Sequence, residues 1–273
     1  RLLLSVTARY YSAGDCLLSP ILFDLITVDW SIKRRLLQAR SQWGYDSISD
    51  IQSAVLHDES ILPKLLNFLT VQVSEMFRDP SYFRALREKV VPHLRTYPSL
   101  KVWVAGCSHG EELYSLAILF AEEGLAERTI FYATDINPTA LKAAQAGVYP
   151  LESIRLFTEN HRLSGGHTSL SDYYTANYDR AVFDKSLRER TVFSDHSLVT
   201  DAAFGEMHLI SCRNVLIYFD RELQDRVVGL FGDALVRGGF LGVGSKESLR
   251  FSAHAHLFSE FVREEKIYRK ASR

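Results

Sequence analysis

The sequence predicts an α/β protein in which a mostly parallel sheet, covered by helices, follows an all-helical N-terminal part. In the first third of the chain, apolar residues recur at spacings of three and four, the period of amphipathic helices. Farther on, short apolar runs alternate with helical patterns, which indicates βαβ units. The change falls near Pro92 to Ser99, so we expect a helical domain plus linker over residues 1–98 and an α/β domain over residues 99–273.

The predicted helical domain contains an amphipathic helix pair that is broken near His57 to Ser60. Its apolar positions are Ile48, Ile51, Val55, Leu62, Leu65, Leu66 and Leu69. An earlier predicted helix carries the basic side chains Lys33, Arg34, Arg35 and Arg40. This basic cluster is either a partner-binding face or a solvated helix face, and the two interpretations have similar weight.

The α/β domain begins with a predicted βαβ unit, with strands over residues 101–105 and 129–134 around a helix over 111–123. Helices over 138–146 and 221–236 and strands over 207–211, 240–243 and 266–269 continue the alternation. The segment from Tyr173 to Phe193 has a different sequence pattern, with isolated aromatic and β-branched residues among charged residues. It predicts a small, hairpin-rich β-subdomain over about residues 173–193.

Composition narrows the classes of function. The chain has 273 residues, 32 Lys and Arg against 33 Asp and Glu, and a formal net charge of -1, so no overall attraction to nucleic acid or anionic membranes is expected. No run approaches the roughly 20 apolar residues that span a bilayer. Three cysteines, Cys16, Cys107 and Cys212, cannot all pair, which favours reduced thiols in a cytoplasmic protein and gives no support for a metal site.

A glycine-containing segment from Gly106 to Glu112 follows the first predicted strand, at the edge where doubly wound sheets bind ligands. Its G-x-x-x-G spacing matches neither the dinucleotide fingerprint nor a phosphate-binding P-loop. Two glutamates would repel phosphate, but Glu111 could attract a ligand that carries an ammonium or sulfonium group. Alternatively, Glu111 and Glu112 complement the positive N-terminus of the next helix.

Polar residues also follow the next strands. Asp135 ends the second strand, where a carboxylate can accept hydrogen bonds from both hydroxyls of a ribose; the alternative is a helix N-cap, for which Asn137 competes. After the strand over 207–211, Asn214 could contact the same ligand. Tyr218 is as consistent with packing as with an active-site role. Arg213 is interpreted as a structural ion-pair partner.

Together these segments resemble the CheR family of chemoreceptor methyltransferases. The resemblance is carried by residues 70–78, 105–115, 133–137 and 212–220 and extends over about residues 47–270. It implies a Rossmann-like class I methyltransferase domain with a mostly parallel seven-stranded sheet and a small antiparallel β-subdomain. It also implies S-adenosyl-L-methionine as cofactor, with S-adenosyl-L-homocysteine as product, and an N-terminal helical domain that recognises the receptor.

The family's cofactor contacts transfer position by position to Gln72, Ser74, Arg78, Gly106, Glu111, Asp135, Ser197, Leu198, Asn214 and Val215. Gln72 and Ser74 stand where the family usually has Asn and Thr, and Ser197 where it has Asn. His109 and Leu113 replace the usual Thr and Pro. Arg78 and Tyr218 are the candidate catalytic residues, and no metal is expected.

The activity implied by the resemblance is methylation of glutamate carboxylates on the cytoplasmic helical bundle of a methyl-accepting chemotaxis receptor. No nucleic acid or membrane insertion is expected. Relatives that use a receptor's C-terminal pentapeptide as a tether bear a glycine-containing loop in the β-subdomain, and this chain has no glycine between Gly166 and Gly205. A pentapeptide tether is therefore not expected. Alternatives are a class I methyltransferase with another substrate and an adaptor that binds receptors without turnover.

Overall fold

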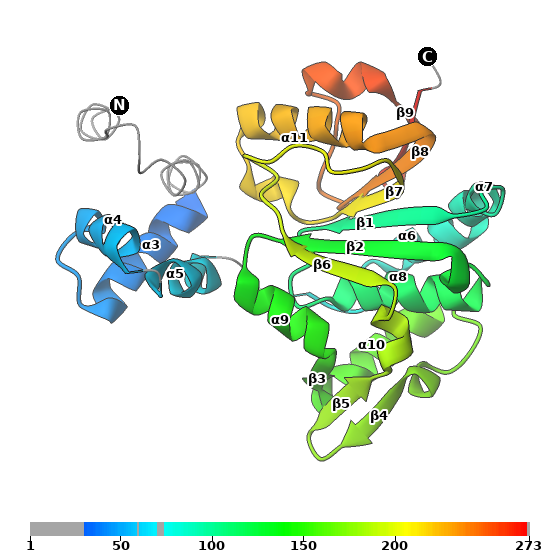
Figure 1. Ribbon diagram of the computed structural model, residues 1–273, viewed down its shortest axis with the longest axis horizontal. Coiled ribbons are helices and arrows are strands. Elements are labelled where there is room, and N and C mark those ends of the chain that lie inside the picture. Colours follow the sequence, from blue (N-terminus) through cyan, green and yellow to red (C-terminus); the bar gives the residue numbers. More distant parts are fainter. Residues whose placement is uncertain (1–29, 59, 70–73, 272–273) are drawn as a thin grey trace. The chain divides into compact units, whose positions relative to one another are not determined.

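The structure, a computed structural model, describes residues 30–58, 60–69 and 74–271 (Figure 1). It divides into two compact units, Arg1–Leu69 and Thr70–Arg273. This division lies before the boundary at residue 98 that the change from helical to alternating strand and helix patterns predicts. The reason is that apolar side chains of residues 80–94, among them Tyr82, Phe83 and Val90, lie in the core of the larger unit. The sequence pattern changes where helices are followed by the first strand, and this point lies inside the larger unit.

In the part of the N-terminal unit that the structure describes, the helices are α3 (Trp30–Trp43), α4 (Ile48–His57) and α5 (Ile61–Leu69). α4 begins with a capping box, in which Ser47 and Asp50 each accept the backbone N–H of the other. The predicted helix pair and its break are confirmed. Ile51, Val55, Leu65, Leu66 and Leu69 are all buried, as their spacing predicts.

The larger unit is built on a seven-stranded sheet with the order β6-β2-β1-β7-β8-β10-β9. The strands are β1 (Leu100–Ala105), β2 (Thr129–Asp135), β6 (Thr191–Asp195), β7 (Met207–Cys212), β8 (Leu235–Val243), β9 (Phe258–Val262) and β10 (Ile267–Lys270). Strands β6, β2, β1, β7 and β8 pair in parallel, and β10 pairs antiparallel with β8 and β9. The mostly parallel seven-stranded sheet of a class I methyltransferase is confirmed, and β9 is one of its strands that the sequence patterns did not mark.

Helices cover both faces of this sheet (Figure 1). Successive side chains of β1 point to opposite faces. Val102 and Val104 join the core that includes α8 (Glu111–Glu122), and Trp103 and Ala105 join the core that includes α11 (Arg221–Ala234). Besides short 3-10 turns, the other helical segments described in the unit are α6 (Pro80–Ala85), the π-helical η1 (Leu86–Val90), α7 (Val91–Leu94), α9 (Pro138–Ala146) and α10 (Leu151–Leu163). Because residues 102–105 of β1 are buried on both faces, they form a continuous apolar run.

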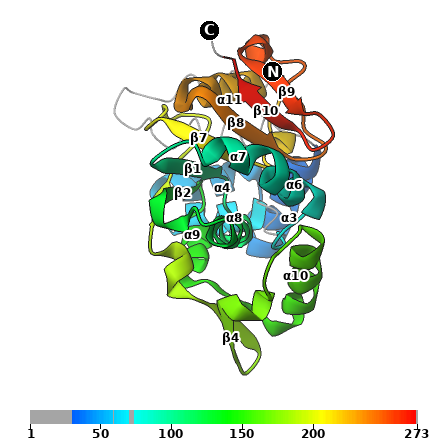
Figure 2. The same cartoon turned by 90° about the vertical axis from the view of Figure 1, so that its right-hand side faces the viewer.

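A small antiparallel sheet of order β3-β5-β4 lies at the opposite end of the larger unit from β9 and β10 (Figures 1 and 2). Its strands are β3 (Val148–Pro150), β4 (Tyr174–Asn177) and β5 (Arg180–Phe183). The predicted β-subdomain is therefore present with different bounds. Strand β3 joins it from before α10, whereas residues 191–195 form β6, which pairs with β2 at the edge of the main sheet.

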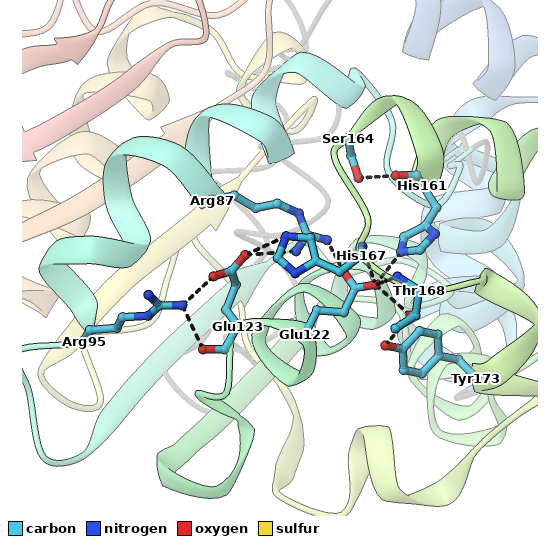
Figure 3. Close-up of polar contacts among 9 residues, drawn as sticks. All are labelled: Arg87, Arg95, Glu122, Glu123, His161, Ser164, His167, Thr168 and Tyr173. Carbon is cyan, nitrogen blue, oxygen red and sulfur yellow. Dashed lines mark hydrogen bonds and ion pairs between the residues drawn. The ribbon is translucent and has the colours of Figure 1, made fainter.

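A buried polar network ties the C-terminal end of α8 to three other segments (Figure 3). The Glu122 carboxylate is fully buried, forms an ion pair with Arg87 of η1 and receives hydrogen bonds from His161 of α10 and from Thr168. Burial alone would raise the pKa of Glu122, but the hydrogen bond from His161 and the charge of Arg87 hold it at about 2. The network holds the end of α8 against η1, α10 and the segment at Thr168 that precedes strand β4 of the small sheet.

Two further findings concern the described residues only. None of their helices is both long and apolar enough to cross a membrane. They contain no group of three or more His, Cys, Asp or Glu side chains that could hold a metal ion. Cys107 and Cys212 are buried free thiols, and Cys16 lies outside the described residues.

We expect Glu122→Gln to lower the free energy of unfolding by about 1–3 kcal/mol, because an amide cannot satisfy all the buried donors. The wild-type contribution is present above the ordinary pKa of 4.5 and is lost as the pH falls toward about 2. Urea unfolding at pH 7 and at pH 3 measures both effects. The exposed Glu159, paired with Arg162, is the control, and Glu159→Gln should change stability by less than about 0.5 kcal/mol. Equal losses in the two variants would contradict this account.

Candidate cofactor and active site

The loop from Gly106 to Gly110 connects β1 to α8 and passes close to neighbouring segments. Gly106 has φ +73°, and a Cβ atom there would lie 2.6 Å from Cγ2 of Val215. Gly110 has φ +95°, and its Cβ would lie 3.0 Å from Cβ of Ala144. Both positions therefore require glycine, which lacks a side chain and tolerates the left-handed region. The N–H groups of Gly106 and Cys107 each donate to the Thr134 carbonyl at 2.9 Å, which joins the loop to β2.

Glu111, the first residue of α8, is 5% exposed, and its Oε2 atom has no hydrogen-bond partner among the described residues. Burial raises the pKa of Glu111 to about 7. Its neighbour Glu112 instead pairs with Arg213. A glutamate can complement a helix N-terminus while exposed to water, so this role does not account for the free-energy cost of burying Glu111. A cationic ligand group would offset that cost.

Asp135, at the end of β2, links two loops. Its Oδ2 accepts the N–H of Ser108 at 2.8 Å, and its Oδ1 accepts the N–H of Asn137 at 2.9 Å. Asn137 itself caps α9, accepting from Thr139 and Ala140, so the N-cap alternative for Asp135 is wrong. Burial raises the pKa of Asp135, and these backbone hydrogen bonds oppose the shift. Each carboxylate oxygen keeps a lone pair that could accept from a ligand hydroxyl.

Asn214 and Val215 follow β7, and Val215 is the residue that packs against Gly106. Asn214 has φ +61°, an unfavourable conformation that asparagine tolerates better than most residues. The buried carboxylate of Glu247 accepts the N–H of Asn214 at 3.0 Å. Sequence reasoning missed Glu247, which no motif marks. Tyr218 lies in the 3-10 turn η5 (Leu216–Tyr218) and is half-buried.

Arg213 has the structural role that the sequence favours. Its guanidinium donates to Asp79 Oδ2 at 2.6 Å and to the Arg78 carbonyl at 3.0 Å, and it lies 4.1 Å from the centre of the Tyr82 ring. The Phe77 N–H also donates to the Ser115 hydroxyl at 2.7 Å. These contacts fix the backbone of the segment that carries Arg78, whose side chain is half-buried, as is Ser74. Gln72 lies outside the described residues.

Ser197 and Leu198 follow β6. The Ser197 hydroxyl accepts the Thr200 N–H at 3.2 Å and thus closes a turn, and Leu198 packs in the core beneath α11. Asp135 is paired with Asp195 in the register of β2 and β6, so the residues after β6 begin beside Asp135.

Four of the described candidate residues thus lie at one edge of the sheet. Asp135 ends β2, and Gly106, Ser197 and Asn214 follow the carboxyl ends of β1, β6 and β7, which with β2 are adjacent parallel strands. This is the edge at which open α/β sheets bind their ligands.

Comparison with known proteins agrees with this arrangement. The family model described as CheR methyltransferase, SAM binding domain, matches residues 72–266. The chain belongs to the CheR methyltransferase family. A Pseudomonas putida protein named "Putative methyltransferase Cher3" is 55% identical over 241 residues, which cover 88% of each chain.

More distant relatives carry names from chemotaxis. A "Chemotaxis protein methyltransferase" of Listeria monocytogenes is 32% identical over 220 residues, covering 80% of this chain and 81% of the relative. "Chemotaxis protein methyltransferase 1" of Vibrio cholerae is 28% identical over 235 residues, covering 80% of each. The resemblance that the sequence motifs predict is confirmed.

S-adenosylmethionine is the cofactor of this domain, and the residues present fit it. The unpartnered Oε2 of Glu111 can accept from the ammonium group, Asp135 can accept from the ribose hydroxyls, and Gly106 allows a close approach of the backbone. In this assignment backbone N–H groups hold the Asp135 carboxylate before the ligand binds, whereas Oε2 of Glu111 has no such donor among the described residues.

We expect Asp135→Asn to raise the dissociation constant for S-adenosylhomocysteine about tenfold or more, because it removes a charged acceptor and disturbs the two loops. Isothermal titration calorimetry of wild type and variant measures this. Unchanged affinity in a folded variant would rule out Asp135 as a cofactor contact.

A second expectation concerns pH. Since the Glu111 pKa is about 7, the carboxylate becomes protonated as the pH falls through that value, and cofactor affinity should fall with it. Glu111→Gln should bind S-adenosylhomocysteine more weakly and lack this part of the pH dependence between about pH 6 and 8. Calorimetric titrations across that range test it, and the same pH profile in both proteins would assign the titration to another group.

Proposed function

We propose that this protein transfers a methyl group from S-adenosylmethionine to glutamate side chains of a chemoreceptor, forming glutamate methyl esters. The observation that carries the proposal is the buried carboxylate of Glu111, whose Oε2 has no hydrogen-bond partner among the described residues, at the same sheet edge as Asp135. The names of the Listeria and Vibrio relatives support the choice of chemotaxis. The helical unit that ends at Leu69 is proposed to recognise the receptor.

The chemistry needs little from the protein beyond alignment. S-adenosylmethionine supplies a methyl group bonded to a positively charged sulfur. A substrate glutamate has an ordinary pKa near 4.3 and is already ionised at neutral pH, so no general base is required. The site residues then act by holding the substrate carboxylate in line with the methyl group at about 3–3.5 Å and by excluding water.

Arg78 is the proposed residue for binding a carboxylate, either of the cofactor or of the substrate, through a bidentate contact. Its backbone is fixed because Arg213 donates to its carbonyl and Ser115 accepts from the adjacent Phe77 N–H. Tyr218, on the turn that follows Asn214 and Val215, is the second proposed catalytic residue.

The receptor's cytoplasmic helical bundle is the proposed partner, approached by the basic residues of α3. Within that cluster Arg34 is exposed, whereas Arg35 donates to the Leu69 carbonyl at 3.2 Å. The β4–β5 turn contains Tyr178, with φ +51° and 96% exposed, instead of a glycine. We therefore propose that no pentapeptide tether is used; saturable binding of a receptor C-terminal pentapeptide would contradict this.

The deciding experiment is transfer of radiolabelled methyl groups to purified receptor cytoplasmic fragments, followed by release of volatile methanol in base, which is diagnostic of methyl esters. Labelling that is lost when the receptor glutamates are changed to alanine supports the proposal. Cofactor binding without labelling of any receptor fragment would leave a methyltransferase for another substrate, and absence of cofactor binding would leave a receptor-binding adaptor.

We expect Arg78→Lys to lower kcat/KM for receptor methylation by about tenfold or more, because lysine keeps the charge but not the bidentate geometry. Arg162→Lys, at an exposed ion pair with Glu159, is the matched control and should retain wild-type kinetics. Initial-rate measurements at varied receptor and cofactor concentrations separate the two substrates. Wild-type kinetics for Arg78→Lys would exclude a bidentate role for this arginine.

A further inference from the structure

Glu247 lies in the loop after β8, far from every sequence motif of the site, yet it is only 4% exposed. Its carboxylate accepts from backbone amides of two segments. Oε2 accepts the N–H of Asn214 at 3.0 Å and of Gly244 at 2.5 Å, and Oε1 accepts the N–H of Ile217 at 3.1 Å. Two of these three donors belong to the loop that follows β7, so a residue on one loop holds the backbone of another.

The loop that Glu247 holds would not keep its shape through local interactions alone. Asn214 is in the left-handed region, with φ +61°, which costs free energy for any residue other than glycine. A carboxylate that binds the N–H groups of Asn214 and Ile217 together fixes the three-residue separation between them. The hydrogen bond from Tyr218 N–H to the Val215 carbonyl, at 3.1 Å, completes the turn.

Gly244 provides the space for this contact. A Cβ atom at position 244 would lie 2.8 Å from Glu247 Oε2, 2.9 Å from the Asn214 backbone nitrogen and 2.9 Å from its Nδ2. These separations are shorter than side-chain contacts allow, and the backbone nitrogen cannot move away without breaking the hydrogen bond to Glu247. The glycine and the glutamate therefore act together on Asn214.

The consequence reaches the cofactor loop. Val215 lies between the two N–H groups that Glu247 binds, and its Cγ2 occupies the space where a Cβ of Gly106 would be. A shift of the loop after β7 would thus move Val215 against the backbone of Gly106, and it would also displace Tyr218. The carboxylate of Glu247 contacts both ends of this turn, at the N–H groups of Asn214 and Ile217.

We infer that Glu247 is a positioning residue for methyl transfer, whose carboxylate sets the backbone of residues 214–217 so that Asn214 and Val215 meet the cofactor and Tyr218 faces the substrate. The kinetic part of this inference rests on the proposed function. The cofactor-binding part does not, because affinity for S-adenosylhomocysteine is measured without a receptor.

The test compares Glu247→Gln and Gly244→Ala with Glu122→Gln in the intact chain. Glu247→Gln places an amide donor against backbone N–H groups, and Gly244→Ala pushes Asn214 away while leaving the carboxylate in place. Glu122 is the matched control because it is also a buried carboxylate with several donors, but it lies at the C-terminal end of α8 (Figure 3). All three variants are expected to unfold at lower temperature than wild type.

Only the two variants near Asn214 should affect the site in the folded state. At a temperature where each protein is folded, we expect their dissociation constants for S-adenosylhomocysteine to rise about tenfold or more and that of Glu122→Gln to change less than about twofold. In receptor methylation, kcat should fall while KM for the receptor stays within about twofold.

Wild-type affinity in folded Glu247→Gln and Gly244→Ala would overturn the inference, as would an equal loss in Glu122→Gln. Failure of both site variants to fold would also overturn it, since Glu247 would then be needed for general stability. If the wild type binds S-adenosylhomocysteine but methylates no receptor, the proposed function fails while the comparison of affinities still decides the role of Glu247.

Discussion

Two buried carboxylates, Asp135 and Glu247, accept backbone N–H groups from the loops that follow the central strands, and the geometry of the site depends on them. Loops at the carboxyl edge of a parallel sheet leave amide donors without strand partners, and buried donors need acceptors. Asp135 supplies them between β1 and β2, and Glu247 supplies them between β7 and β8. Each acid therefore joins the loops of two adjacent strands.

Glu111 differs from these two acids in its hydrogen bonding. It is as deeply buried as the other two acids, but its Oε2 atom has no donor among the described residues, and its pKa rises to about 7. A buried carboxylate without a partner is unfavourable until a cationic group arrives. The contrast separates acids that build the site from an acid that is available to a ligand, a distinction that residue type alone does not make.

The segment around Arg78 is attached to the site from three directions. Ser115 of α8 accepts the Phe77 N–H, Asn160 of α10 donates to the Met76 carbonyl, and Arg213 donates to the Arg78 carbonyl. This attachment explains why the compact catalytic unit begins at Thr70, well before the first strand. It also supports the proposed role of Arg78, a residue outside the sheet, in the site at the sheet edge.

The sequence alone determined the alternation of strands and helices, the glycine positions after β1, and the acids at Glu111 and Asp135, because apolar periodicity and strand-end motifs are local signals. Tertiary structure decided the rest. The unit boundary at Leu69 depends on packing between segments that are distant in sequence. Strand β3 pairs with β5 in the small sheet, and β9 pairs with β10, through contacts that local patterns do not specify. Glu247 binds Asn214 across 33 positions of sequence, and only folding brings a carboxylate that no motif marks to the amides it holds.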